Sequence, residues 1–265
     1  MANLVAVKDM LAEKNIEAEI REVTKNGQTF ETLALEVGDK QLRPCIYNKD
    51  DIDDEQMVQM CVDSFNSEMP KFETESIMDW TVAREMVKLS VQRVASDDLV
   101  SREFLDLAII YEVDVEGLGV AKVTKQILEV WGVSETEVYK TAYANSKFHA
   151  QTLESKMNAL MGIVCEESEV SAAGMYIVTN ESCFHGAGAI VKTDEIQRIA
   201  EMVGTDLYII PSSIHELLLI GTDMILKSEV EEMVASVNDS EVAPEERLSY
   251  SVYRYDRKSR DVVLD

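Results

Sequence analysis

The 265-residue sequence is short of positive charge: 25 lysines and arginines stand against 50 aspartates and glutamates, for a net charge of −25. A chain this acidic is repelled by the phosphate backbone of nucleic acids and by anionic membrane surfaces. We therefore expect no direct contact with nucleic acid. The excess of carboxylates has two interpretations: a solvated surface that keeps the chain soluble, or an acidic face that engages a basic protein partner.

Cysteine pairs and long apolar runs are also missing. The four cysteines, Cys45, Cys61, Cys165 and Cys183, include no C-x-x-C pair, which favours reduced thiols in a cytoplasmic protein. Lys8 interrupts the apolar start of the chain too early for a signal peptide. No apolar run reaches the length of a membrane span, so we expect no contact with a membrane.

Known catalytic and cofactor motifs are absent as well. The sequence has no G-x-S-x-G, H-E-x-x-H or protein-kinase motif. The range 186–188 (GAG) lacks the lysine and the longer glycine pattern of a phosphate-binding loop. Cys183 and His185 form one close pair of possible zinc ligands, whereas structural zinc sites usually show two such pairs. We therefore predict no metal site and no cofactor, and a solvent-facing turn over 183–185.

What the sequence does contain is a dense series of core signals between residues 175 and 220. Two short apolar runs, 175–178 and 207–210, are typical of buried strands. Between them, a helix over 194–204 has a capping box at Asp194 and a glycine at its end, and a third strand is expected over 215–220. Because the run 207–210 has no charge on either face, we expect it in the middle of a sheet.

The first part of the chain predicts a helix, a hairpin and two further helices. Apolar residues at helical spacing over 2–15 precede strand residues on either side of Asn26-Gly27, a dipeptide that suits a type I′ turn. The carboxylates of 50–55 suit the start of a helix, and they lack the central glycine and closing glutamate of a calcium loop. A longer helix is expected over 76–94.

The stretch 102–115 (REFLDLAIIYEVDV) predicts one long strand in which Asp106 is the single charge within the apolar run. A buried carboxylate must find a partner or shift its pKa. Alternatively, the alternation of a strand carries the Asp106 side chain to water or to a backbone donor.

These elements do not follow the strict β-α-β alternation of a doubly wound sheet. We therefore predict an α+β protein, with a mixed sheet and flanking helices in a single compact module. Within it we expect an N-terminal helix/hairpin/helix subregion over 1–95 and the main core over 96–265.

Among the candidate catalytic residues, His215 fits proton transfer best. On a strand, Ser213 and His215 share one face and Glu216 points to the other, so a catalytic relay would need a group from elsewhere in the chain. The functional hypothesis is a small hydrolase-like enzyme that uses these three residues with Asn180 at strand ends. The alternative is a structural histidine held by a neighbouring hydroxyl or carboxylate. Because Pro211 and an apolar run flank His215, we expect it to be fixed rather than free in solvent.

Two acidic clusters are candidates for binding a basic protein. They consist of Asp50, Asp51, Asp53, Asp54 and Glu55, and of Glu166, Glu167 and Glu169. Because no catalytic constellation is complete, we favour a non-enzymatic interaction protein over the hydrolase. Carboxylates gathered on one ridge would support binding, whereas convergence of His215, Asn180 and Asp106 in a cleft would support catalysis.

Four stretches stand out for another reason: FLDLAIIYEV, MYIVTN, LYIIPSSIHE and VYRYDR. In this order they resemble an uncharacterised bacterial family of unknown function, from anaerobic gut-type bacteria. The resemblance spans residues 23–257 and implies one continuous module in a bacterial cytoplasm. It implies no activity, cofactor or catalytic residue.

Overall fold

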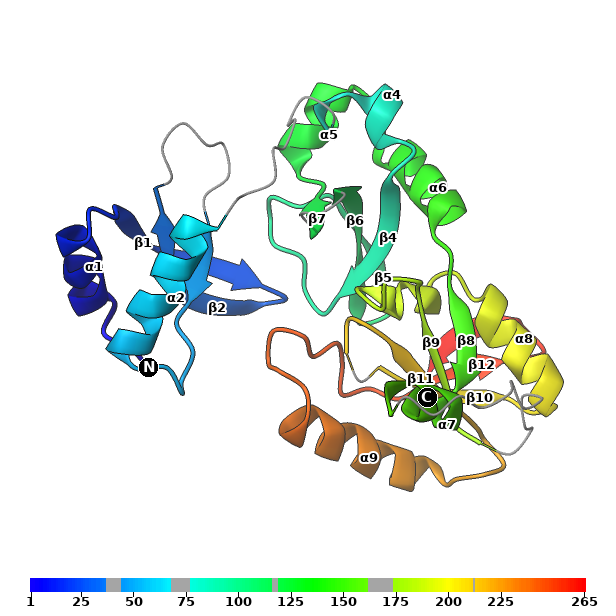
Figure 1. Ribbon diagram of the computed structural model, residues 1–265. Coiled ribbons are helices and arrows are strands. Elements are labelled where there is room, and N and C mark those ends of the chain that lie inside the picture. Colours follow the sequence, from blue (N-terminus) through cyan, green and yellow to red (C-terminus); the bar gives the residue numbers. More distant parts are fainter. Residues whose placement is uncertain (37–43, 68–76, 116–118, 162–173, 212) are drawn as a thin grey trace. The chain divides into compact units, whose positions relative to one another are not determined.

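The computed structural model describes residues 1–36, 44–67, 77–115, 119–161, 174–211 and 213–265 (Figure 1). The chain divides into two compact units, Met1–Phe72 and Glu73–Asp265. Residue 95, where we expected the N-terminal subregion to end, lies inside the larger unit. Each unit is described by itself below.

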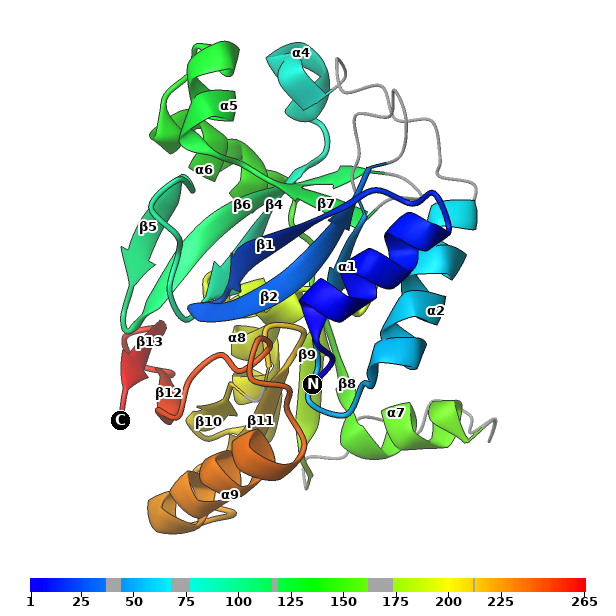
Figure 2. The same ribbon diagram turned by 90° about the vertical axis from the view of Figure 1, so that its left-hand side faces the viewer.

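The smaller unit packs two helices against one face of an antiparallel sheet with the order β1-β2-β3 (Figure 2). Its elements are α1 (Leu4–Glu13), β1 (Ala18–Lys25), β2 (Gln28–Leu35), β3 (Cys45–Tyr47) and α2 (Asp54–Asn66). The hairpin turns at Asn26-Gly27 with φ values of 48° and 78°, as a type I′ turn requires. Leu11, Met57 and Leu33 belong to one buried apolar cluster that joins both helices to the sheet.

The larger unit contains two antiparallel sheets, with the orders β4-β6-β5 and β13-β12-β10-β11-β9-β8, and β7 also pairs with β6. Its elements are α4 (Trp80–Ala83), β4 (Val87–Gln92), β5 (Ser101–Phe104), β6 (Leu107–Val115), β7 (Gly119–Lys122), α5 (Lys125–Trp131), α6 (Glu135–Asn145), β8 (His149–Thr152), α7 (Leu153–Leu160), β9 (Tyr176–Thr179), the 3₁₀ helix η1 (Gly186–Ile190), α8 (Asp194–Val203), β10 (Leu207–Ile210), β11 (Leu217–Gly221), α9 (Lys227–Ser240), β12 (Tyr253–Asp256) and β13 (Asp261–Leu264).

Strand β10 lies in the interior of the six-stranded sheet, between β12 and β11, and all four of its residues are buried. This confirms the position expected from its uncharged faces. Tyr208 and Ile210 pack against Val230 and Val234 of α9, while α8 contacts β11 and β12 (Figure 1). Helix α8 ends at Gly204 with φ 85°, as predicted, but its N-cap is the preceding threonine, which makes no side-chain cap bond.

Two predicted elements are wrong. In its described part, the helix expected over 76–94 is limited to residues 77–78 and the short α4, and strand β4 follows, whose residues pair with β6. The strand expected over 102–115 is a hairpin of β5 and β6 that turns at Leu105 (φ 54°) and Asp106. Asp106 is exposed in that turn, where its carboxylate accepts hydrogen bonds from Ser249, Ser251 and Tyr253.

The α+β class is confirmed, since the described helices accompany three antiparallel sheets rather than a parallel one. In place of one mixed sheet, all strand pairs among the described residues are antiparallel. The reason is connectivity: hairpins such as β1-β2, β5-β6 and β12-β13 link neighbouring strands directly, and a hairpin makes its two strands antiparallel.

Candidate functional site

The loop between β9 and η1 contains two residues with side chains in the left-handed region, followed by a glycine without room for a Cβ atom. Cys183 and His185 adopt left-handed φ values of 53° and 55°, each of which costs a residue with a side chain about 1–3 kcal/mol. Gly186 follows, and a Cβ atom there would lie 2.3 Å from Thr179 Oγ1 and 2.6 Å from the carbonyl oxygen of His215. Only glycine fits this close approach, which fixes the loop against both strand ends.

His185 points inward and pairs with Glu112 of β6. Its Nδ1 lies 2.7 Å from Glu112 Oε2, and the two side chains are 12% and 4% exposed. When Glu112 is a carboxylate and the imidazole is neutral, Nδ1–H donates this hydrogen bond and Nε2 carries the lone pair. A histidine oriented by a buried carboxylate in this way can take a proton through Nε2.

The second oxygen of the same carboxylate is unusual. Glu112 Oε1 is buried and has no hydrogen-bond partner among the described residues, although buried polar atoms nearly always have one. Two residues further along β6, Asp114 is paired with Lys88 Nζ at 2.8 Å. No described residue therefore uses the hydrogen-bonding capacity of Glu112 Oε1.

A cavity of about 260 Å³ opens beside this pair, lined among others by Glu112 and His185. A second cavity, of about 410 Å³, adjoins it. Five residues line both: Lys88, Leu89, Asp114, Asn180 and Ser182. The two cavities therefore form one groove, with the Glu112–His185 pair along one part of it and both polar and apolar residues along the rest.

His215 is held in place behind the loop, as expected. Its Nδ1 accepts a hydrogen bond from the backbone N–H of His185 at 3.2 Å, and its carbonyl oxygen accepts from Gly186 N at 2.9 Å and Thr179 Oγ1 at 2.8 Å. Its Nε2 lies 3.5 Å from Glu246 Oε1, and its ring stacks at 5.4 Å on that of His185. With one ring nitrogen accepting and the other facing Glu246, His215 positions the loop.

The remaining candidate catalytic residues, and Asp106, do not converge on a single site. Asn180 lines both cavities and holds the loop by accepting from Phe184 N at 3.2 Å and donating to Phe184 O at 2.7 Å. Ser213 Oγ accepts from the backbone N–H of His215, and Glu216 is paired with Lys156 at 2.8 Å. Asp106 is not among the described residues that line either cavity. Asn180 and His215 therefore contact the same loop and Ser213 contacts the His215 backbone, whereas the Glu216 side chain is paired with Lys156 and Asp106 lines neither cavity.

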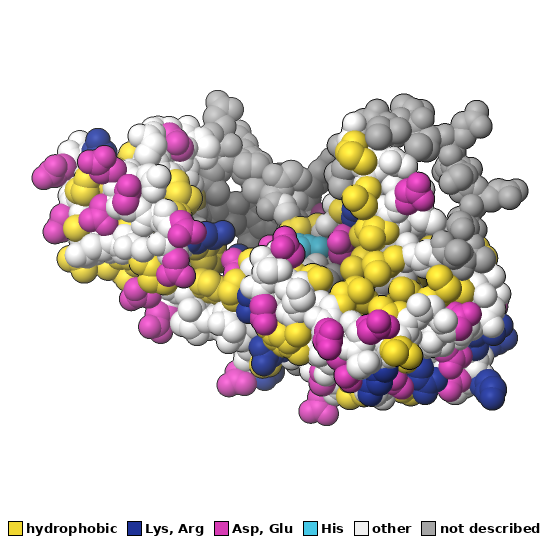
Figure 3. All heavy atoms as spheres, turned by 90° about the horizontal axis from the view of Figure 1, so that it is seen from below, with side chains coloured by type: hydrophobic (Ala, Val, Ile, Leu, Met, Phe, Trp, Pro, Cys, Tyr) yellow, Lys and Arg dark blue, Asp and Glu magenta, His cyan; other side chains and the backbone are white. Residues whose placement is uncertain are grey.

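The first acidic cluster begins helix α2. Asp53 forms a capping box with Gln56, and Asp54 accepts from the backbone N–H of Asn3 at 2.6 Å. The second cluster, Glu166, Glu167 and Glu169, lies outside the described residues. In Figure 3, acidic side chains are spread over the visible surface rather than gathered on one ridge.

Sequence reasoning missed His185 and Glu112. His185 was expected in a solvent-facing turn, and Glu112 was one residue of a predicted strand. The available signal was a histidine directly before a glycine in the loop that follows a buried strand, but the partner carboxylate lies 73 positions earlier in the chain.

A family model described as a family of unknown function (DUF5688) matches residues 4–257. The chain belongs to this family. No curated protein and no solved structure matches it. The resemblance inferred from the sequence is confirmed to this extent, while a bacterial source stays a prediction. Throughout the described ranges, every helix is too short or too polar to cross a bilayer.

Proposed function

We propose that the larger unit is an enzyme in which His185 acts as a general base and Glu112 orients its ring. One observation carries the proposal: the buried Glu112–His185 pair lines a cavity and leaves Glu112 Oε1 without a partner among the described residues. The sequence favoured a non-enzymatic protein because no catalytic constellation was complete. A base, its orienting carboxylate and a cavity support the enzyme instead.

The reaction that suits these groups is hydrolysis of a small polar substrate. Nε2 of His185 takes a proton from a water molecule, the hydroxide attacks the electrophilic carbon or phosphorus, and the bond from that atom to the leaving group breaks. The proton on His185 then passes to that leaving group. Glu112 Oε1 accepts a hydrogen bond from an N–H or O–H of the substrate, which favours substrates with hydroxyl or amine groups beside the reacting centre.

Hydrolysis of a panel of nitrophenyl esters, phosphates and glycosides tests the proposal. We expect His185→Gln to lower the rate by about 10²–10⁴-fold, the usual contribution of a general base. Glu112→Gln keeps the size of the side chain and should lower the rate less. His149→Gln is the matched control, because His149 is exposed on β8 and is not among the residues lining either cavity.

Ser182→Ala separates the two nucleophiles that the cavity offers. Retained activity supports water, whereas loss of activity with intact melting would assign the attack to the Ser182 hydroxyl. If His185→Gln hydrolyses every substrate as fast as the wild type does, or if the wild type hydrolyses none of them, the proposal is wrong.

A basic protein partner is the second candidate function. Asp50, Asp51 and Glu55 are exposed, and no ion pair joins them to a described residue. Their charge would speed association with a basic protein and lose that effect at high salt. The test is retention of a basic protein by the wild type at low and high salt, compared with the triple neutral variant. A cytoplasmic location is part of this proposal and is supported by Cys61 and Cys183, whose thiols form no disulfide with any described residue.

A further inference from the structure

The turn between β12 and β13 carries an unusual concentration of positive charge for this chain. Three of its four residues are cations, although the protein has twice as many acids as bases. Together with Tyr255 and two residues of α8, these cations line a cavity of about 340 Å³. The lining residues are Gln197, Glu201, Tyr255, Arg257, Lys258 and Arg260.

The lining of this cavity also includes a buried tyrosine, Tyr255. The residue is 1% exposed, and its hydroxyl has no hydrogen-bond partner among the described residues. A buried tyrosine normally satisfies its hydroxyl. Burial raises the pKa of Tyr255 above its ordinary value. The hydroxyl therefore stays protonated at neutral pH and can donate a hydrogen bond to a ligand.

The cations divide into one with a structural role and two without. Arg257 donates to the carbonyl oxygen of Gly204, which ends α8, and this accounts for its position. Lys258 and Arg260 are exposed and form no ion pair with any residue in the described part of the chain. Glu201 is the one acid of the lining, and Gln197 donates to it at 2.7 Å. The lining is therefore net positive.

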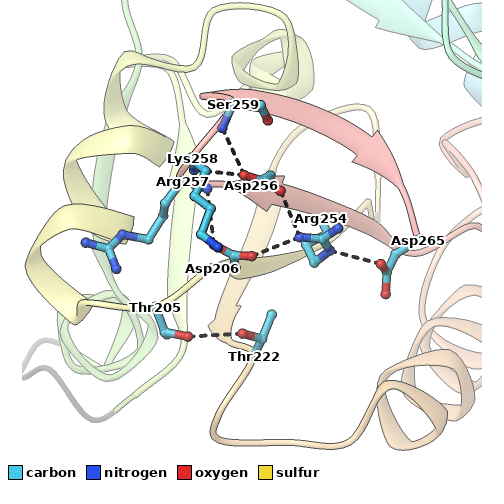
Figure 4. A network of polar contacts seen from close by, with 9 residues as sticks. All are labelled: Thr205, Asp206, Thr222, Arg254, Asp256, Arg257, Lys258, Ser259 and Asp265. Carbon is cyan, nitrogen blue, oxygen red and sulfur yellow. Dashed lines mark hydrogen bonds and ion pairs between the residues drawn. The ribbon is translucent and has the colours of Figure 1, made fainter.

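A polar network fixes the turn before any ligand arrives (Figure 4). The guanidinium of Arg254 contacts Asp206 at 2.8 Å and Asp265 at 2.9 Å. Asp256 accepts from the backbone N–H groups of Lys258 at 2.8 Å and Ser259 at 2.9 Å. A preformed turn holds its side chains near their bound positions and so lowers the entropy cost of binding.

We propose that this cavity binds the phosphate group of a small soluble molecule. Lys258 and Arg260 would balance its charge, and the Tyr255 hydroxyl would donate a neutral hydrogen bond. Phosphate suits the set because its several oxygens accept from charged and neutral donors at once. The volume lies in the range of small-molecule pockets and leaves room for more than a bare ion. The site is independent of the His185 groove.

Calorimetric titration of the full chain with inorganic phosphate and with glycerol phosphate tests the proposal. We expect saturable binding that is tighter for glycerol phosphate. The double variant Lys258→Gln, Arg260→Gln should weaken it at least tenfold. Lys8→Gln, Lys14→Gln is the matched control, since it removes the same charge from two exposed positions of the smaller unit. It should leave the affinity within twofold of wild type.

Tyr255→Phe distinguishes a ligand-binding hydroxyl from a structural one. It should weaken phosphate binding several-fold, while the unliganded protein melts at the same or a higher temperature, because a buried hydroxyl without a partner is removed. A structural role would instead lower the melting temperature and leave the affinity unchanged.

The proposal is wrong if neither probe binds saturably at millimolar concentration, or if acetate binds as tightly as phosphate. It is also wrong if the control variant weakens binding equally, or if Tyr255→Phe lowers the melting temperature and leaves the affinity unchanged. Sedimentation with phosphatidic acid vesicles, without binding of glycerol phosphate, would also contradict it, because the phosphate source would then be a membrane.

Discussion

The two units differ in how completely their buried polar side chains are hydrogen-bonded. In the smaller unit, Asn48 accepts from Ala2 N at 3.0 Å and donates to Ala2 O at 2.9 Å, and Thr32 donates to the carbonyl of Arg21 at 3.0 Å. In the larger unit, three buried side-chain atoms lack a partner among the described residues: Glu112 Oε1, Asn238 Oδ1 and the Tyr255 hydroxyl.

Two of these three atoms belong to residues that line cavities. Glu112 is also the one acid that is buried among the described residues. An unsatisfied buried polar group costs about 1–3 kcal/mol, so its presence is easier to understand where a ligand completes it. We infer that ligand chemistry is concentrated in the larger unit, whereas the core of the smaller unit serves packing.

The largest expected effect is on the six-stranded sheet. Ile209 is fully buried on the interior strand β10, and Ile209→Asp places a charge without a partner there, at a cost of more than about 4 kcal/mol. Tryptophan fluorescence follows this unit alone, because Trp80 and Trp131 both lie within it. A variant that melts within a degree or two of wild type would contradict the assignment.

Val5→Asp is the control for this prediction. Val5 is 62% exposed on α1 of the smaller unit, so the same added charge remains in water and should change stability by less than about 0.5 kcal/mol. If the two units unfold independently, circular dichroism of the Ile209→Asp protein should retain a separate transition from the smaller unit.

The next effect concerns the loop that carries His185. Gly186→Ala brings a Cβ against Thr179 and backbone atoms, so the loop must shift, at a cost of about 1–3 kcal/mol. Hydrolysis should fall together with stability, because His185 moves with the loop. Gly174→Ala is the matched control: nothing lies within 4 Å of a Cβ there, and no left-handed φ is required. If the two variants have the same stability and hydrolysis rate, the conformation of the loop does not contribute to the proposed mechanism.

The sequence was most informative where a structure depends on local chemistry. Asn26-Gly27 specified its turn, Gly204 ended its helix, and the uncharged run 207–210 marked an interior strand. Each of these signals acts within a few residues, so a single sequence contains all of it.

Prediction failed where the deciding partner is distant. Residues 87–92 were assigned to a helix because their apolar neighbours fit a helical spacing, while pairing with β6 makes them a strand. The turn at Leu105-Asp106 has no glycine or asparagine to mark it. The site shows the same limit: His215 and Asn180 were chosen from local context, but the buried pair that His185 forms depends on Glu112 of β6, which is distant in the sequence.

A smaller effect on stability is expected when the pH is lowered, through the carboxylate of Asp106. Burial raises the pKa of Asp106, but hydrogen bonds from Tyr253, Ser249 and Ser251 outweigh it and leave that pKa below its ordinary value. The carboxylate therefore stabilises the fold above the unfolded pKa, near pH 4, and this contribution is lost as pH falls through the folded pKa. Asp106→Asn should cost about 1 kcal/mol at pH 7, and its difference from wild type should shrink in melts below pH 4. A difference that stays constant from pH 7 to pH 3 would show that the charge is not involved.

The smallest effect is expected at the acidic start of α2 in the smaller unit. Neutralising Asp50, Asp51 and Glu55 to asparagine and glutamine removes exposed charges and should change the free energy of unfolding by less than about 0.5 kcal/mol. Asp53→Ala removes only one charge but breaks the capping box, which should cost about 1 kcal/mol. Chemical denaturation of both variants checks the order. If the triple variant is the less stable, charge rather than capping holds this helix. If it also retains every basic protein that the wild type retains at low salt, the acidity serves solubility and the partner proposal is wrong.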